Sequence, residues 1–314
     1  MSTLAICIPA WNAVSHLPRL MDSIREQTQP FDEVLVHDDA STDETAELAR
    51  SYGATVVHSE DNVGCSLGKN RLAQSTGCDW VHFHDADEAL RPEFVERARR
   101  WMSADAADVV IFATEDRDDV TGEVLGSWQW DDTQVSRDAV RYNIVRNVTN
   151  CGIYRRTRFL EAGGFDVAPE TRYNEDKAMH LRLALAGLSF RAEPYVGVIV
   201  YRRANSMSSG NPVACGRAQF HVLEQTALRV GDRYASDVGR MAWHLAGVCG
   251  TYKDWAYAKR CVDLANGLGH RNPREEGRLF RLLAMMHPMG AVVLREQLIR
   301  WFKPALRRGV PVAV

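Results

Sequence analysis

Short apolar runs and longer helical patterns alternate along the first hundred residues of the chain. Short strands separated by helices indicate βαβ units and a parallel sheet. The sequence therefore predicts an α/β fold, in which a Rossmann-like, mostly parallel sheet is flanked by helices. We expect the strands over 4–8, 33–37, 55–58 and 80–84, and the helices over 14–27, 43–51, 68–75 and 92–102.

Polar residues follow three of these predicted strands directly. They are the Pro-Ala-Trp-Asn segment at 9–12, the pair Asp38 and Asp39, and the triplet Asp85-Ala86-Asp87. Ligands of parallel sheets bind beyond the carboxyl ends of the strands. We therefore expect these three segments to line one binding site.

The triplet Asp85-Ala86-Asp87 brings two carboxylates close together. Like charges at such short range are costly unless a cation or hydrogen bonds compensate them. Hard divalent ions such as Mg²⁺ or Mn²⁺ prefer oxygen ligands and commonly bridge carboxylates to substrate phosphates. An acidic turn in solvent is the alternative, but the position after an apolar strand favours a metal. We therefore expect Mg²⁺ or Mn²⁺ at Asp85 and Asp87.

Two polar motifs allow both a structural and a functional interpretation. Ser41 or Thr42 is suited to cap the next helix, whereas the carboxylate of Asp39 can accept hydrogen bonds from a base or a ribose. Lys69 stands in a segment with two glycines that does not match a phosphate loop. For Lys69 a phosphate contact and exposure to solvent therefore both stay open.

Glu175 and Asp176 open a helix that we predict over 175–186. Carboxylates in the first turn are stabilised by the helix dipole, which is one explanation for the pair. The other is a general base, because removing a proton from a substrate hydroxyl requires a carboxylate within hydrogen-bond reach. For His84, at the end of the fourth strand, a core position and a place beside the metal likewise both stay open.

Charge and cysteine usage narrow the class of protein. The net charge of −3 gives no general attraction to nucleic acid, and the seven cysteines show neither zinc-binding nor redox spacing. No apolar run reaches the roughly 20 residues that a membrane span needs, and no signal peptide is recognised. We therefore expect a cytoplasmic protein that does not bind nucleic acid.

The pattern changes after residue 108, and strand signals stop near residue 210. We predict one domain over 1–210 and a helical C-terminal region over 211–314. The helix expected at 291–302 carries Arg295 and Arg300 among apolar residues, so it either lies on an anionic membrane surface or packs on its own domain. The strands are predicted over 109–114, 123–128, 150–155 and 196–201, and the C-terminal helices over 219–230, 235–248, 254–268, 274–286 and 291–302.

Taken in order, these motifs resemble glycosyltransferase family 2, an inverting family with a GT-A fold. The family's I-P-x-[YF]-N motif is similar to residues 8–12, and its D-D-x-S-x-D motif to residues 38–43. Its N-x-G motif and the N-x-[AG] helix that follows it look like residues 62–64 and 70–73, its D-x-D motif like residues 85–87, and its E-D pair like Glu175-Asp176. Order and spacing agree over residues 4–205, and the ordered set is more specific than any one motif.

The resemblance implies a role for each matched residue. Asp176 would be the general base, with Glu175 as the less favoured choice, and Asp87 would be the principal metal ligand beside Asp85. A loop with Tyr201, Arg202, Arg203, Ser206 and Ser208 would meet the diphosphate or the acceptor. The nucleotide sugar would be bound by Pro9, Trp11, Asn12, Asp39, Asp85 and Ala86, to which Lys69 is added from its position alone.

The implied activity is inverting transfer of a sugar from a nucleotide-diphosphate sugar, with UDP favoured, to an acceptor hydroxyl. The acceptor would be a glycan or a lipid-linked molecule in the synthesis of cell-surface glycans. The Q-x-x-R-W signature and the membrane helices of processive members are absent, which implies transfer of one sugar. A sugar-phosphate nucleotidyltransferase and a catalytically silent scaffold remain as alternatives, and formation of a homo-oligomer and peripheral membrane contact stay open.

Overall fold

The computed structural model describes residues 2–203, 206–207, 209–271, 273, 277–308 and 310. The chain forms two compact units, which we call the sheet unit and the helical unit. The functional boundary near residue 210 stays a prediction. The sheet unit contains Met1–Asn143, Val148–Val167 and Glu175–Arg203, and the helical unit contains Ile144–Asn147, Ala168–Asn174 and Ala204–Val314.

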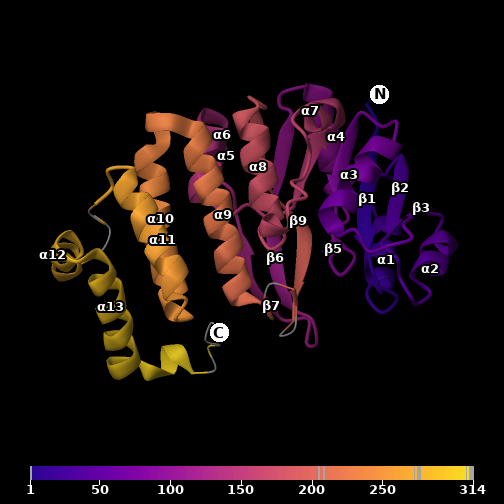
Figure 1. Cartoon of the computed structure of the whole chain (residues 1–314). Coiled ribbons are helices and arrows are strands. Elements are labelled where there is room, and N and C mark those ends of the chain that lie inside the picture. The colour runs from indigo at the N-terminus through magenta and orange to yellow at the C-terminus, as the bar shows by residue number, and fades with distance from the viewer. Residues whose placement is uncertain are drawn as a thin grey trace. The chain divides into compact units, whose positions relative to one another are not determined.

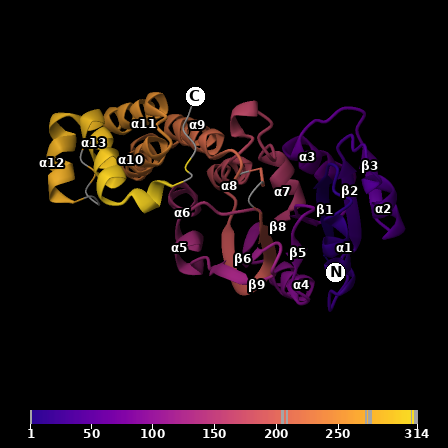
Figure 2. The same cartoon turned by 90° about the horizontal axis from the view of Figure 1, so that it is seen from below.

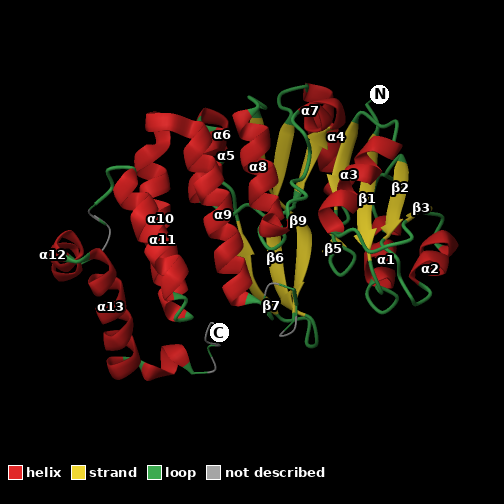
Figure 3. Cartoon of the chain, in the orientation of Figure 1, coloured by secondary structure: helices red, strands yellow, loops and turns green. Residues whose placement is uncertain are grey.

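A single sheet forms the centre of the sheet unit (Figures 1 and 3). Its strands are β1 (Leu4–Ala10), β2 (Glu33–Asp38), β3 (Thr55–His58), β4 (Trp80–Phe83), β5 (Ala89–Leu90), β6 (Val109–Asp118), β7 (Val124–Trp128), β8 (Gly152–Arg155) and β9 (Phe190–Arg202). They follow the order β3-β2-β1-β4-β8-β6-β9-β5, and β7 pairs with β6. All seven residues of β1 are buried, so this strand lies in the core of the sheet.

The strand pairing is mixed. Strands β1 to β4 are parallel to one another, as the alternating pattern predicts. Strand β8 is antiparallel to both β4 and β6, whereas β6 and β9 are parallel. The structure thus confirms the α/β fold class, but the second half of the sheet is less parallel than we expected.

Helices cover both faces of this sheet. In Figure 2, α3 and α7 lie on one side and α1 and α4 on the other. For α1 and α3 this follows from right-handed crossovers, because the chain moves in opposite directions from β1 to β2 and from β3 to β4. The helices up to residue 185 are α1 (Leu17–Arg25), α2 (Thr45–Ser51), α3 (Cys65–Ser75), α4 (Phe94–Ala104), α5 (Asp132–Arg137), α6 (Ala139–Val145), α7 (Arg156–Glu161) and α8 (Glu175–Leu185).

The described part of the helical unit contains helices and short 3-10 turns. Its longer helices are α9 (Pro212–Val230), α10 (Ala235–Thr251), α11 (Trp255–Gly267), α12 (Arg278–Met286) and α13 (Pro288–Phe302). The 3-10 turns are η1 (Pro169–Thr171), η2 (Gly231–Tyr234) and η3 (Pro304–Arg307). Helix α10 packs between α9 and α11 (Figure 1). Within the described residues, none of the helices combines the length and the apolarity that crossing a bilayer requires.

Several boundaries differ from the predictions for local reasons. Strand β9 begins at Phe190 rather than 196, because a shift in its register with β6 accommodates Pro194. Helix α9 begins at Pro212 rather than 219, since proline is well suited to the first turn of a helix. Strand β5 and helices α5, α6 and α7 were not predicted. The predicted helix start at 274–276 lies outside the described residues.

Candidate active site

The loops that follow β1 and β2 are tied to each other. Asn12 has a positive φ of 49°, and its side-chain oxygen accepts a hydrogen bond from Thr42 N at 2.8 Å. In return, Asn12 N donates to Ser41 Oγ at 3.0 Å. Trp11, next to this junction, is 59% exposed, whereas Pro9 is buried in β1. The structure thus brings the predicted nucleotide-binding loops together at the carboxyl end of the sheet.

This junction also corrects the predicted helix cap. Ser41 and Thr42 bond to Asn12 and do not cap α2, which begins at Thr45. Instead, the carboxylate of Asp43 accepts a hydrogen bond from Thr45 N at 3.1 Å. The two polar residues were assigned to a helix end because the sequence does not reveal the neighbouring loop.

Asp39 anchors the loop before α3. Its two carboxylate oxygens accept hydrogen bonds from Val63 N at 2.7 Å and Gly64 N at 2.8 Å. Asp39 is buried, so these bonds are shielded from water. Gly64 has a φ of 85°, which a residue with a side chain rarely adopts. Asp39 thus has a clear structural task, and its contact with a base or ribose stays a prediction.

Lys69 is buried and paired with Asp85. Its side chain is 1% exposed, and Nζ lies 2.9 Å from Asp85 Oδ1. Burial alone would lower the pKa of Lys69, but Asp85 and Asp176 raise it well above its ordinary value. Lys69 is therefore positively charged, and of the two interpretations left open for it, exposure to solvent is wrong. Its contact with a phosphate stays a prediction.

Glu175 and Asp176 lie at the start of α8 and are held by two other segments. Asp176 Oδ2 accepts a hydrogen bond from Asn150 N at 3.0 Å, and Asn150 Nδ2 donates to Phe83 O, at the end of β4, at 3.0 Å. Cys65 Sγ, on α3, donates to Glu175 Oε1 at 3.7 Å. These contacts bring the E-D pair to the same edge of the sheet as Asp85.

One carboxylate oxygen in this cluster is left without a hydrogen bond. Asp176 Oδ1 is buried and has no partner among the described residues. Buried polar atoms nearly always have a partner, so such an exception calls for an explanation. An oxygen that accepts the proton of a bound hydroxyl would provide one.

Burial changes the protonation of this pair. It raises the pKa of Asp176 to about 6, an effect that Lys69 opposes and Asp85 strengthens. Burial, and then the charge of Asp176, raise the pKa of Glu175 to about 7. Because the two carboxyl groups interact, they lose their protons in two steps, and the two pKa values belong to the pair rather than to either residue. Near neutral pH the pair is thus poised to take up a proton, which a general base requires.

Asp87 faces a cluster of arginines. Its carboxylate is paired with the Arg203 guanidinium, and its backbone oxygen accepts from Arg19 Nη2 at 2.8 Å. Arg19 also lies over the ring of Tyr201, 3.5 Å from its centre, and pairs with Asp119 at 2.8 Å. The predicted closing segment therefore reaches Asp87 through the end of β9. Ser206 lies in the helical unit, and Ser208 lies outside the described residues.

The oxygen ligands that the D-x-D triplet offers fit a hard divalent cation. The side chains of Asp85 and Asp87 are 44% and 36% exposed, so their oxygens are accessible. Burial and then the charges of Asp85 and Asp87 raise the pKa of Glu88 well above its ordinary value. Extra positive charge would relieve this repulsion. Among the described residues no three His, Cys, Asp or Glu side chains form a metal cluster, so most ligands would come from the donor diphosphate or water.

Two histidines beside the triplet belong to the core. His82 Nε2 lies 2.9 Å from His84 Nδ1, and His82 Nδ1 lies 2.8 Å from Gly152 O. Both rings are fully buried, and burial lowers the pKa of each. Both histidines are therefore neutral near pH 7. Of the two interpretations left open for His84, the structure supports the core position.

Two residues of the site escaped prediction. Arg19 meets Asp119 across 100 positions of sequence, and no local pattern in α1 indicates this. Asn150 was placed inside a predicted strand, but β8 begins only at Gly152. The amide and side chain of Asn150 are thereby free of the strand ladder and reach Asp176 and Phe83.

Comparisons with known proteins show which proteins the chain is similar to. Residues 5–163, half of the chain, match the family model described as Glycosyl transferase family 2. The putative glycosyltransferase EpsH of Bacillus subtilis is 25% identical over 223 residues, which are 66% of this chain and 62% of EpsH. The 4,4'-diaponeurosporenoate glycosyltransferase of Staphylococcus aureus is 52% identical over 100 residues, 30% of this chain and 26% of that protein. The chain thus spans less than two thirds of the length of these relatives.

Solved structures share the fold along nearly the whole chain. Residues 1–349 of S. aureus TarS, in complex with UDP-GlcNAc, align with a TM-score of 0.70 at 15% identity, covering 96% of this chain and 92% of that one. The mannosyltransferase PcManGT from Pyrobaculum calidifontis, in complex with GDP-Man and Mn²⁺, aligns with a TM-score of 0.59 at 16% identity, covering 96% and 81%. The fold is therefore of the GT-A type, with a helical C-terminal region. Together with the match over residues 5–163, this shows that the chain belongs to glycosyl transferase family 2.

Proposed function

We propose that the chain transfers one sugar from a UDP-sugar to an acceptor hydroxyl, with inversion at the anomeric carbon. The single observation that carries the proposal is the buried, unpartnered Oδ1 of Asp176 in the cluster with Lys69 and Asp85. The UDP-GlcNAc bound to TarS supports UDP as the nucleotide. Pro9, Trp11, Asn12, Asp39, Lys69, Asp85 and Ala86 are the candidate contacts of the donor.

Asp176 acts in this proposal as the general base. Its Oδ1 takes the proton of the acceptor hydroxyl. The hydroxyl oxygen of the acceptor then bonds to the anomeric carbon while the bond from this carbon to the diphosphate breaks. Asn150 N–H holds the other carboxylate oxygen and so orients Asp176. Attack opposite the leaving group inverts the stereochemistry. Glu175, whose Oε1 already accepts from Cys65, is the less favoured choice.

Asp87 and Asp85 are the proposed ligands of Mg²⁺ or Mn²⁺. When bound, the cation neutralises charge on the leaving diphosphate. The Mn²⁺ in the PcManGT complex supports a divalent metal in this fold. Arg203, now paired with Asp87, and Arg19, bound to its backbone oxygen, are further cations next to the diphosphate position.

The wider biological role is proposed in coarser terms. The proposed acceptor is a glycan or lipid-linked molecule in cell-surface glycan synthesis; the names of the relatives support the sugar transfer itself. Residues 1–210 would hold the chemistry, and 211–314 would contact the acceptor, a membrane or a second copy. We propose a cytoplasmic location with peripheral membrane contact.

Donor turnover tests the proposed function. The purified chain is incubated with Mn²⁺ and a panel of nucleotide sugars, and release of nucleoside diphosphate is measured. We expect release from one UDP-sugar, lost on chelation of the metal. Release of pyrophosphate from a nucleoside triphosphate and a sugar phosphate would instead identify a nucleotidyltransferase. Failure to bind any nucleotide sugar would favour the silent scaffold.

A further inference from the structure

Exposed apolar side chains are concentrated near the end of the helical unit. The described residues include seventeen large apolar side chains that are exposed, and nine of them lie between 279 and 306. Soluble proteins rarely leave a large apolar patch uncovered unless it is an interaction site. We call the segment α12–α13–η3 the terminal segment. Its exposed apolar residues are Leu279, Leu282, Met285, Met286, Leu294, Leu298, Trp301, Phe302 and Leu306.

The apolar residues follow helical spacing on the side that does not pack. On α13, Val292 and Glu296, spaced by four positions, are buried, whereas Leu294, Leu298 and Trp301 are exposed. These exposed residues are spaced by four and three positions, so they share one face of the helix. On α12, Leu279, Leu282 and Met286 repeat this pattern around the buried Ala284. Both helices therefore have one packed face and one unpacked apolar face.

The terminal segment is also strongly basic. Between residues 278 and 308 the chain has seven Lys or Arg and one acidic residue, Glu296. That carboxylate is 3% exposed and lies 2.9 Å from both Arg300 Nε and Arg307 Nε, so it adds little negative charge at the surface. The basic residues are Arg278, Arg281, Arg295, Arg300, Lys303, Arg307 and Arg308.

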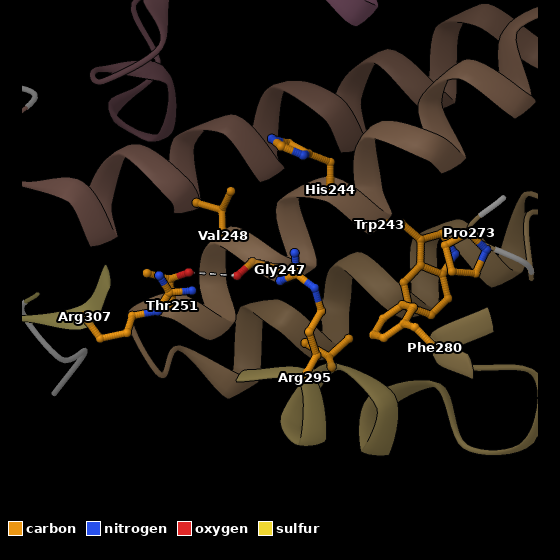
Figure 4. Close-up of a pocket in the computed structure, with 10 residues that line it drawn as sticks. Trp243, His244, Gly247, Val248, Thr251, Pro273, Phe280, Arg295 and Arg307 are labelled. Atoms are coloured by element: carbon orange, nitrogen blue, oxygen red, sulfur yellow. Dashed lines mark hydrogen bonds between the residues drawn. The ribbon is translucent and has the colours of Figure 1, made fainter. Parts of the chain in front are cut away.

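A small cavity adjoins this segment. It has a volume of about 180 Å³ and is lined on one side by Trp243 and Phe280, whose rings meet edge-on at 6.3 Å. Figure 4 shows Arg295 and Arg307 extending toward Thr251 and its neighbours on α10. Phe280, Arg295 and Arg307 directly follow the exposed Leu279, Leu294 and Leu306 in sequence. The terminal segment thus contributes Phe280, Arg295 and Arg307 to the lining of this cavity.

We propose that the terminal segment docks on an anionic lipid bilayer. Its apolar side chains enter the boundary between headgroups and acyl chains, its Lys and Arg side chains meet lipid phosphates, and the cavity beside Arg295 receives one headgroup. Apolar burial combined with attraction to anionic lipid is the way in which interfacial helices bind membranes. The inference does not depend on the proposed sugar transfer, because binding to lipid needs no donor.

Charge favours a bilayer over a second copy of the chain. Two copies that met through this surface would bring two strongly basic segments together, with the acidic residue of each already buried and paired. Like charges across an interface are unfavourable, whereas an anionic lipid surface complements them. The structure buries Val292 and exposes α12 as well.

Co-sedimentation of the full chain with vesicles tests the proposal. We compare vesicles of phosphatidylcholine alone with vesicles that also contain about one third of the anionic lipid phosphatidylglycerol. We expect binding only to the anionic vesicles, weakened about tenfold by Trp301→Ser with Phe302→Ser. Lys303→Gln and Arg308→Gln, both exposed, should each weaken binding about fivefold. Arg295→Gln tests the cavity and should weaken binding by at least as much.

Matched variants on α9 provide the control. Leu228 is 77% exposed and Arg229 is also exposed, so Leu228→Ser and Arg229→Gln remove similar groups elsewhere in the same unit. They should leave vesicle binding unchanged. Equal binding to both vesicle types, equal losses in the α9 controls, or no loss in Arg295→Gln would overturn the proposal. So would a dimer in ultracentrifugation that Trp301→Ser with Phe302→Ser abolishes, since it would identify a second copy as the occupant.

Discussion

Asp176→Asn separates the chemistry of the site from its stability. The substitution keeps the size of the side chain and an oxygen that can accept from Asn150 N–H, but it removes the negative charge and the basic Oδ1. If Asp176 is the general base, donor turnover should fall about a hundred- to ten-thousand-fold. The cluster around Lys69 and Asp85 should otherwise stay assembled, so binding of UDP should change little.

Although Asp176→Asn should lower the activity, it should raise the stability of the fold at pH 7. Burial raises the pKa of Asp176 from an ordinary 3.8 to about 6, so at pH 7 the folded chain holds an unfavourable negative charge. A shift of this size corresponds to about 1–3 kcal/mol, and a neutral amide removes it. The folded pKa lies above the unfolded one, so the penalty is complete above about pH 6 and disappears as the pH falls towards 3.8. The variant should therefore melt a few degrees higher at pH 7 and equally at pH 4.

Three measurements on the same protein check this reasoning. They are the release of UDP from the donor identified by the panel, the calorimetric binding of UDP, and thermal unfolding at pH 7 and pH 4. Glu175→Gln is the matched control, which should also stabilise the fold but lose less activity. Normal turnover in Asp176→Asn would refute the assignment of the base. A lower melting temperature at pH 7 would refute the electrostatic argument, and loss of activity in the Glu175 variant alone would exchange the two roles.

Three further substitutions test other parts of the site. Lys69→Met removes the charge that lowers the pKa of Asp176, so the acid limb of the rate–pH profile should move up by about one pH unit; an unmoved limb would contradict the role of Lys69. Asp87→Ala should abolish the Mn²⁺ dependence of UDP binding in calorimetry, whereas Asp105→Ala, at an exposed aspartate, should leave it intact. Asp39→Asn can accept only one of the two backbone N–H bonds, so urea unfolding should show a loss of about 1–3 kcal/mol; an unchanged midpoint would show that the 62–64 loop does not need this anchor.

The first half of the sheet was predictable because its information is local. Apolar runs such as the fully buried β1 and the helices between them depend on residues near each other in sequence. The second half was harder. Strand β9 contains Pro194 and reaches its full length only through a shifted register with β6, which lies about 80 residues earlier. Pairing between strands so far apart in the sequence is not evident from the local pattern of residues.

The candidate site, like the sheet, could be predicted only in part from the sequence. The ordered motifs from residues 8–12 to Glu175-Asp176 were enough to indicate the family by resemblance. Separately, the rule that the ends of parallel strands meet at one edge predicted that Asp39, Asp85 and Asp87 lie together. Sequence alone could not determine the partners of those groups. The burial of Lys69 against Asp85 and the pairing of Asp87 with Arg203 arise only when distant segments meet.

Protonation shows most clearly what tertiary structure adds. The sequence determined that Asp176 is a carboxylate at a helix start, where the helix dipole would favour its charged form. Only the folded chain decided that it is buried beside Asp85, with one oxygen held by Asn150 and the other unpartnered, and that its pKa rises instead. Residue types and their order therefore determined which chemical groups are present. Burial and long-range contacts, which depend on every packed neighbour, decided the charge and the task of each.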